Sequence, residues 1–263
     1  KPLTDRISFS EQIFSVQRNM AGSDDERLES LVTALNDSDI DYLWAIRGGH
    51  GALRILDRIP TTLNCSDKIL IGYSDITAYQ WFFYKTYGMK SIAGPMIQVD
   101  FSKEYRADRL KFLWDLINKS KSTFPLDKSI KTHNYRSIEA PLIGGCLSII
   151  CRLCGTPYMP DLNGHILFLE DVNEEIYRID SMLAQLKLNG LFRQIKGVIL
   201  GQFSFSSDKE NQENELLDLY RDYFWDLDIP VIYNFPHGHI DQLVPLPIGY
   251  HLRLGENELE FTR

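Results

Sequence analysis

KILIGYSDITAYQWFFYKTYGMKSIA, residues 68–93, decides the fold. Its first part, 68–71, is a short apolar run that predicts a buried strand. A glycine turn follows, and the residues from Ile76 to Tyr87 predict a helix that Gly88 closes. Ser91–Ala93 then predicts a second strand. A strand, a turn, a helix and another strand in this order indicate a parallel α/β sheet.

The residues before this stretch contain the same unit. Ser23 and Glu26 have the spacing of a capping box, and the apolar residues after them recur at helical spacing. A short apolar strand at 42–46 follows and ends at the glycine-rich turn RGGHG, residues 47–51. We expect a second helix at 53–59, which extends the parallel sheet by one strand and one helix.

The residues after the stretch have a different pattern. A helix that ends near Ile117 leads into residues 118–134, which are polar and rich in Lys, Ser and Thr. We therefore predict an N-terminal α/β domain at 1–117, a linker at 118–134 and a C-terminal domain at 135–263. In the second domain the predicted strands are 166–169, 198–200 and 231–233, two helices carry apolar stripes at 179–186 and 216–223, and a hairpin covers 251–261.

Composition and charge exclude several classes of function. The chain has 263 residues, and 28 basic against 36 acidic residues give a net charge of −8. An acidic protein has no field to attract phosphate backbones or anionic lipid, so we expect neither a nucleic-acid partner nor a membrane partner. The first twenty residues lack the apolar region of a signal peptide, although the chain opens at Lys1 and a segment before it is conceivable. Four cysteines fit a reducing compartment, and we expect a cytoplasmic protein.

Ser74 is a candidate nucleophile because it lies where a strand gives way to a helix. The N–H of Asp75 would point into the same space and could stabilise an oxyanion. Gly72-Tyr73-Ser74 is half of a nucleophile elbow, but Ile76 replaces its second glycine. The competing interpretation is that Ser74 only caps the helix.

Gly48, Gly49 and Gly51 lie just past the preceding strand. In a parallel sheet their loop would neighbour the Ser74 turn, so Gly48 or Gly49 could offer a second oxyanion N–H. No Gly-Lys-Ser/Thr follows, which excludes a Walker motif. The alternative is a tight turn that needs positive φ.

Two further segments carry groups for acid–base chemistry. His237 and His239 share a loop after a strand, where each could be a general base, a metal ligand or a solvated side chain. Zinc needs at least a third protein ligand, which no local spacing supplies. In Glu170–Glu174, Asp171 or Asn173 could cap the next helix, whereas Glu170 is well placed to orient a histidine.

Cys151 and Cys154 form a Cys-x-x-Cys pair, and Cys146 precedes them. All three lie in an apolar stretch where small thiols are ordinary packing. We therefore predict core positions for them, with a redox or metal site as the alternative.

Taken together, these segments resemble the LD-carboxypeptidase family of serine peptidases, which also contains the microcin C immunity proteins. The similarity runs almost end to end. Its motifs are MAGSD at 20–24 with Arg27, RGGHG at 47–51, GYSDIT at 72–77, GPM at 94–96, GTPY at 155–158, LEDVNE at 169–174, YRID at 177–180 and FPHGH at 235–239.

The resemblance implies a Ser-His-Glu triad of Ser74, His239 and Glu170, spread over two domains, without a cofactor or metal. It implies a glutamine-amidotransferase-like α/β domain followed by a swivelling, β-rich α/β domain, often in a homodimer. Two departures stand out. Family members begin with a further strand and helix before MAGSD, and Cys146 replaces the asparagine of the family's Gly-Gly-Asn, a position expected to contact substrate.

The expected activity is that of a serine LD-carboxypeptidase that releases the terminal D-alanine from a murein tetrapeptide. Arg47 and Arg178 are the candidates for binding the substrate carboxylate, because a guanidinium binds it bidentately. One alternative is a microcin-immunity-type amidase that acts on an aminoacyl nucleotide, and another is a muropeptide-binding protein without turnover. A metallohydrolase that uses His237 and His239 ranks last.

Overall fold

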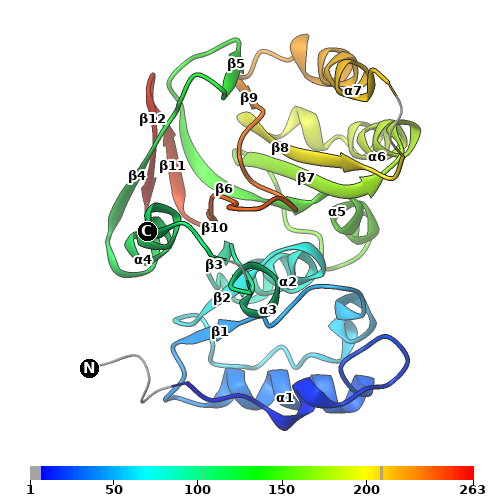
Figure 1. The fold of residues 1–263 in the computed structure, drawn as a ribbon, viewed down its shortest axis with the longest axis vertical. Coiled ribbons are helices and arrows are strands. Elements are labelled where there is room, and N and C mark those ends of the chain that lie inside the picture. The colour runs from blue at the N-terminus through cyan, green and yellow to red at the C-terminus, as the bar shows by residue number, and fades with distance from the viewer. Residues whose placement is uncertain (1–6, 103, 208–209) are drawn as a thin grey trace.

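The computed structural model describes residues 7–102, 104–207 and 210–263, which form a mixed α/β protein. These residues build a four-stranded and an eight-stranded sheet, one above the other in Figure 1. The helices are α1 (Asp24–Asn36), α2 (Thr77–Tyr87), α3 (Ile97–Asp100), α4 (Ala107–Asn118), α5 (Leu147–Leu153), α6 (Ile176–Leu188) and α7 (Gln212–Tyr220). The strands are β1 (Tyr42–Trp44), β2 (Ile69–Gly72), β3 (Ser91–Ala93), β4 (Lys121–Pro125), β5 (Lys131–His133), β6 (Glu139–Cys146), β7 (Ile166–Glu174), β8 (Gly197–Phe205), β9 (Val231–Tyr233), β10 (Leu246–Ile248), β11 (His251–Leu254) and β12 (Glu258–Thr262). No helix in these ranges is long and apolar enough to cross a bilayer.

The first sheet has the order β1-β2-β3-β10. Strands β1, β2 and β3 are parallel, which confirms the strand–turn–helix–strand prediction for residues 68–93. The predicted capping box also forms, because Ser23 Oγ accepts from the Glu26 N–H while the Glu26 carboxylate accepts from the Ser23 N–H. Strand β10 comes from the far end of the chain and pairs antiparallel with β3.

The predicted helix at 53–59 is wrong. Two short 3₁₀ turns, Ala52–Arg54 and Leu56–Arg58, take its place. Only eight positions separate Gly51, which has φ of 117°, from Pro60, and the residue before a proline is disfavoured in helical geometry. The segment is therefore too short to propagate an α-helix.

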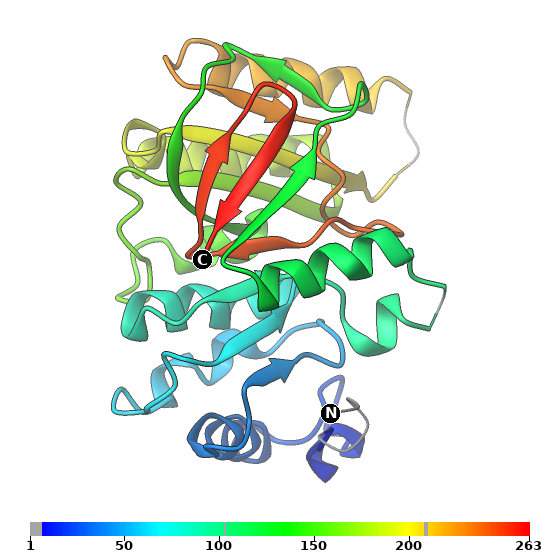
Figure 2. The ribbon, with the colours of Figure 1, turned by 90° about the vertical axis from the view of Figure 1, so that its left-hand side faces the viewer.

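The second sheet has the order β4-β12-β11-β6-β7-β8-β9-β5. Its centre, β6 to β9, is parallel, and antiparallel strands lie on both sides. Figure 2 shows the hairpin β11–β12 with β4 beside it, although β4 lies far earlier in the chain. The three strands and the hairpin predicted for this region are all present, and β7 and β8 extend beyond the predicted bounds.

Residues 118–134, which we expected to be a linker, contain the strands β4 and β5, and both belong to the second sheet. Ser122 and Phe124 are buried between exposed neighbours, the alternation of a strand with one covered face. Lys121 and Thr123 on the outer face contribute to the polar composition of the stretch, so composition indicated a linker where alternation indicated a strand.

Helix α2 joins the two sheets. The indole N–H of the fully buried Trp81 donates to the Gly144 carbonyl on β6 at 2.8 Å. One turn earlier, Thr77 Oγ1 accepts from the Cys146 N–H at 3.2 Å. Gly145 leaves room for this contact, since a Cβ there would lie 2.5 Å from Thr77 Oγ1. These contacts hold the start of α2 against the carboxyl end of β6.

Candidate active site

Ser74 lies two residues past the end of β2 and has a left-handed conformation, with φ of 65°. A residue with a Cβ pays for such a φ, of the order of 1 to 3 kcal/mol, and strain of this kind is typical of a nucleophile turn between strand and helix. Ser74 opens a 3₁₀ turn that precedes α2, and the cap positions, Tyr73 and Ile76, make no side-chain cap hydrogen bond. The interpretation of Ser74 as a helix cap is therefore wrong.

Gly48 lies against the nucleophile candidate, as the predicted adjacency of the two loops requires. A Cβ at Gly48 would be 2.9 Å from the Cβ of Ser74 and 3.0 Å from its Oγ. Any side chain at this position would push on the Ser74 hydroxyl. Gly49 has φ of 128° and open space around it, so the loop provides both backbone freedom and room beside Ser74.

The carboxylate of Asp75 has a role that the sequence did not reveal. It is 7% exposed, and its Oδ2 accepts the Ala52 N–H at 2.8 Å. Burial raises the pKa of Asp75, and the hydrogen bond from Ala52 opposes this shift only in part. The side chain thus ties the Ser74 turn to the loop that follows β1.

Glu170 and His239 form a pair in which Glu170 is buried and His239 is half-buried. Glu170, on β7, is 0% exposed, and His239 Nδ1 lies 2.8 Å from its Oε2. A carboxylate accepts only, so Nδ1 carries the proton and Nε2 keeps its lone pair. Burial alone would lower the pKa of His239, but the hydrogen bond and charge of Glu170 outweigh it and the net shift is upward. This is the arrangement of a general base oriented by a carboxylate.

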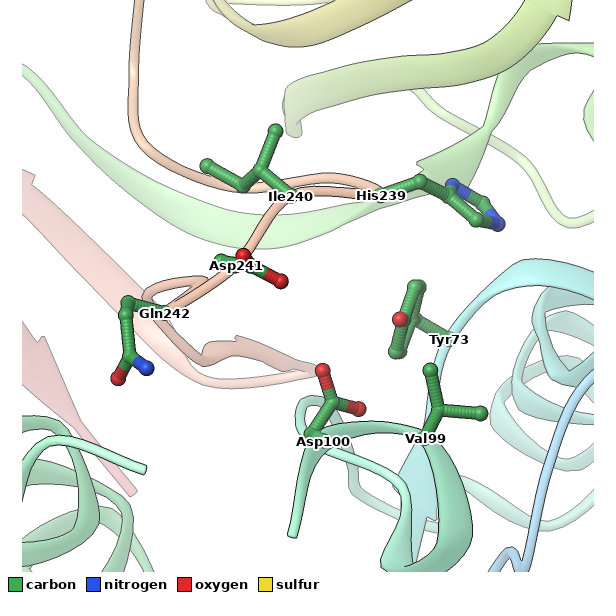
Figure 3. Close-up of a pocket in the computed structure, with 7 residues that line it drawn as sticks. All are labelled: Tyr73, Val99, Asp100, His239, Ile240, Asp241 and Gln242. Carbon is green, nitrogen blue, oxygen red and sulfur yellow. The ribbon is translucent and has the colours of Figure 1, made fainter. Parts of the chain in front are cut away.

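Tyr73 connects the Glu170–His239 pair with the turn that carries Ser74. Its ring packs edge-on against His239, with 4.9 Å between centroids, and it directly precedes Ser74. Figure 3 shows that the two rings come from different segments and border one cavity. The cavity holds about 180 Å³ and is lined by Tyr73, Val99, Asp100, His239, Ile240, Asp241 and Gln242. That is less than the ~300 to 1,000 Å³ of sites for drug-sized ligands, so it accommodates only part of a peptide.

His237 has a different environment from His239. It is 1% exposed, its Nδ1–H donates to the Val244 carbonyl at 2.7 Å, and its ring packs against Phe168. Burial lowers the pKa of His237 to about 4, so the ring is neutral at physiological pH. Across the described ranges, no three or more His, Cys, Asp or Glu side chains gather in a way that could hold a metal ion, and the two loop histidines point to different partners.

The cysteines occupy the core, as predicted, with Cys146 and Cys151 buried and Cys154 half-buried. Cys146 stands opposite Glu170 in the β6–β7 register, which places the candidate substrate position beside the buried carboxylate. Its thiol donates to Asp171 Oδ1 at 3.4 Å. Burial, followed by the charges of Glu170 and Asp171, raises the pKa of Cys146 well above its ordinary value, so the thiol stays protonated.

The structure separates the two arginine candidates. Arg47 is exposed, precedes Gly48, and has no ion-pair partner within the residues described. Arg178, on α6, is 61% exposed, lies 3.7 Å from Glu174 and packs over Tyr177. Arg47 is thus next to a residue that touches Ser74, whereas Arg178 has local contacts only.

Models of two protein domains match this chain. Residues 5–94 match the LD-carboxypeptidase N-terminal domain and residues 139–254 match the LD-carboxypeptidase C-terminal domain. Over 234 residues the chain is 31% identical to the probable murein peptide carboxypeptidase of Bacillus subtilis, which covers 88% of this chain and 73% of the relative. The chain belongs to the LD-carboxypeptidase family.

Two other relatives carry different functional names. The crystal structure of muramoyltetrapeptide carboxypeptidase from Oxalobacter formigenes matches with a TM-score of 0.82 and 31% identity, over 94% of this chain and 88% of that one. The microcin C7 self-immunity protein MccF of Escherichia coli is 26% identical over 264 residues, 89% of this chain and 76% of the relative. The LD-carboxypeptidase family is one of serine hydrolases that includes murein peptide carboxypeptidases.

Proposed function

We propose that this protein is a serine-type LD-carboxypeptidase that releases the terminal D-alanine from murein tetrapeptides in peptidoglycan recycling. The observation that carries the proposal is the 2.8 Å contact between His239 Nδ1 and Glu170 Oε2, with His239 packed against the residue before Ser74. Two relatives named for murein peptides at 31% identity support the choice of substrate class.

In the proposed mechanism, Ser74 Oγ attacks the carbonyl carbon of the bond to D-alanine while His239 Nε2 takes its proton. Glu170 holds the imidazole in the required tautomer and stabilises the imidazolium. The Asp75 N–H and one from Gly48 or Gly49 stabilise the oxyanion. The contact of Gly48 with Ser74 supports this assignment, because it brings the glycine backbone to the attacking oxygen.

The tetrahedral intermediate then collapses. The C–N bond to D-alanine breaks, and His239 gives its proton to the leaving amine. Water, deprotonated by His239, attacks the acyl-enzyme, the ester bond breaks, and the proton returns to Ser74 Oγ. The net reaction consumes one water and yields a tripeptide and D-alanine.

Arg47 is the proposed partner of the substrate carboxylate. It directly precedes Gly48, and its planar guanidinium can bind a carboxylate through two parallel hydrogen bonds. Arg178 is the weaker candidate because Glu174 and Tyr177 already contact it.

The test is incubation of the purified protein with disaccharide tetrapeptide, followed by mass spectrometry of the peptide and assay of free D-alanine. We expect loss of one D-alanine with the native protein and none with Ser74→Ala. Tight binding of the tetrapeptide by the native protein without any D-alanine release would overturn the enzyme proposal in favour of a binding protein.

A further inference from the structure

Residues Gly48–Ala52, here called the glycine loop, form hydrogen bonds with two side chains of the N-terminal part of the chain. Neither side chain has a part in the proposed bond-making steps. We propose that Arg27 and Asp75 are positioning residues that hold the glycine loop against Ser74, so that its backbone N–H groups are in place for the oxyanion. The inference rests on the proposed serine mechanism and adds two side-chain roles to it.

Arg27 holds the loop from the side of α1. Its Nη1 donates to the Gly51 carbonyl at 2.9 Å, and its side chain is only 12% exposed. A Cβ at Gly51 would lie 2.9 Å from Arg27 Nη1 and from Met20 Sδ. The guanidinium therefore fills the space that a glycine with φ of 117° leaves open.

Asp24 fixes the direction of the Arg27 side chain. It pairs with Arg27 and also accepts from Arg54 Nε at 3.0 Å, so one carboxylate joins two arginines. Arg54 ends the 3₁₀ turn that begins at Ala52, the last residue of the loop. Hydrogen bonds from Arg54 lower the pKa of Asp24 to about 2, which keeps it charged at physiological pH.

Asp75 holds the loop from the side of the nucleophile. Its Oδ2 accepts the Ala52 N–H at 2.8 Å, and it is the residue directly after Ser74. A carboxylate that is 7% exposed contributes little net stability, because burial penalises its charge. The hydrogen bond instead fixes the distance between the glycine loop and the Ser74 turn. Gly48 lies so close to this turn that a Cβ there would be 2.9 Å from the Cβ of Ser74.

A displaced oxyanion donor impairs the chemical step and leaves substrate binding largely intact. Removing one such donor lowers kcat by about 10²- to 10³-fold. We expect Asp75→Ala to lower kcat by ~10²-fold and Arg27→Met by ~10-fold, each with KM changed less than ~3-fold. Asp75→Asn should lose less than ~10-fold in kcat, because its amide oxygen still accepts the Ala52 N–H.

Arg58→Gln is the matched control. Arg58 pairs with Asp25, the neighbour of Asp24 on α1, but it lies on the second 3₁₀ turn and its ion pair is solvent-exposed. Its loss should leave kcat and KM unchanged. Thermal unfolding of every variant shows whether the fold is kept, and Arg27→Met provides the test if Asp75→Ala does not fold.

A fluorophosphonate probe measures the same geometry without a murein substrate. Ser74 Oγ forms a bond to phosphorus while His239 takes its proton, the P–F bond breaks and fluoride leaves, and the phosphoryl oxygen occupies the oxyanion position. We expect slow labelling in Asp75→Ala and Arg27→Met and native labelling in Arg58→Gln. Native labelling rates and kcat in folded Asp75→Ala and Arg27→Met, or equal damage from Asp75→Asn and Asp75→Ala, would overturn the inference. If the native protein is labelled but releases no D-alanine, the proposed substrate fails and the labelling rates still decide the positioning roles.

Discussion

Nδ1 of His239 lies 2.8 Å from Oε2 of Glu170, although 69 positions separate the two residues in the chain. The pair forms because β7, β8 and β9 are parallel and Ile232, near the end of β9, is in register through β8 with Phe168, two residues before Glu170. Gly238 makes the approach possible, since a Cβ there would lie 3.2 Å from Glu170 Oε2. Glu170 therefore belongs to the second sheet, His239 lies on the loop that leads from β9 to β10, and Ser74 follows a strand of the first sheet.

Replacing members of the proposed triad should abolish turnover without unfolding the protein. We expect Ser74→Ala and His239→Ala each to lower kcat by several orders of magnitude, because the loss of either disables the nucleophile. His237→Ala should instead destabilise the fold, by about 2 kcal/mol or more, with a far smaller kinetic effect, since His237 is a buried, neutral core residue. Steady-state kinetics and thermal unfolding separate the outcomes. Equal kinetic damage from both histidines, restored by added zinc, would contradict the serine mechanism.

The pH profile should report the partnership of His239 with Glu170. The general base must be neutral, so kcat/KM should fall as pH drops through the raised pKa of His239. In Glu170→Gln the opposing effect of burial remains, so this pKa falls and the acidic limb moves to lower pH, while the maximum decreases. A raised pKa also means that the charged pair stabilises the fold below the ordinary histidine pKa, and that this contribution is lost as pH rises. An unmoved acidic limb in Glu170→Gln would show that another group controls the profile.

Arg47 and Arg178 can be distinguished by one pair of variants. Arg47→Met should raise KM for the tetrapeptide by about 10- to 100-fold with little change in kcat, as expected for loss of a charge-assisted contact of roughly 1.5 to 3 kcal/mol. Arg178→Met should change KM by less than ~3-fold, because an exposed pair contributes little. The reverse ranking would assign the carboxylate to Arg178.

Much of the fold could be predicted from local pattern, and the failures have physical causes. The strands and helix of residues 68–93 were readable because apolar runs, a glycine turn and a helix end lie close together in sequence. The strands β4 and β5 were missed because their hydrogen-bonding partners, β12 and β9, lie more than 95 residues away in the chain. Likewise, nothing near β3 indicates that β10 pairs with it.

The candidate site could be predicted only in part, because some of its contacts join residues that are far apart in the chain. Family motifs predicted the candidates Ser74, Glu170 and His239, but the contact of the Asp75 carboxylate depends on the Ala52 N–H, 23 residues earlier. Thr77 and Trp81 resemble ordinary helix residues, and only the fold shows that they bind β6. The homodimer and the swivel between domains stay predictions, because both concern relations beyond a single folded chain.

Cys146→Asn tests the departure from the family's asparagine. An amide supplies a full donor and acceptor where the thiol makes only weak contacts, with Asp171 and with the Ser148 hydroxyl. If position 146 contacts substrate, kcat/KM should be maintained or rise, despite an overpacking cost of about 1 to 3 kcal/mol in stability. Cys146→Ser, with a smaller polar side chain, controls for the loss of the thiol. A large loss of stability without kinetic gain would show that Cys146 is only a core residue.

The last prediction concerns the substrate itself. The aromatic residues between Gly94 and Gly144 are the local candidates for stacking a nucleotide base, yet most of them pack on one another. Their ring contacts are Phe101 with Trp44 and Tyr105, Trp114 with Trp44, and Phe112 with Phe124. A base needs an exposed aromatic face, and among the described aromatic residues of this segment only Tyr135 is exposed, so the packing of the other rings supports our proposal of a peptide substrate.

We therefore expect the protein to release D-alanine from disaccharide tetrapeptide and to leave the same peptide with a terminal L-alanine intact. The wrong stereocentre would turn the carboxylate away from its donor and leave buried polar groups unpaired, which is worth a discrimination of about 10⁴ or more. Mass spectrometry of both peptides, beside an aminoacyl-sulfamoyl adenosine, measures all three reactions in one experiment. Cleavage of the nucleotide with the D-alanyl peptide untouched would reverse the choice, and equal cleavage of both peptides would show that the site does not read the carboxylate through a fixed donor.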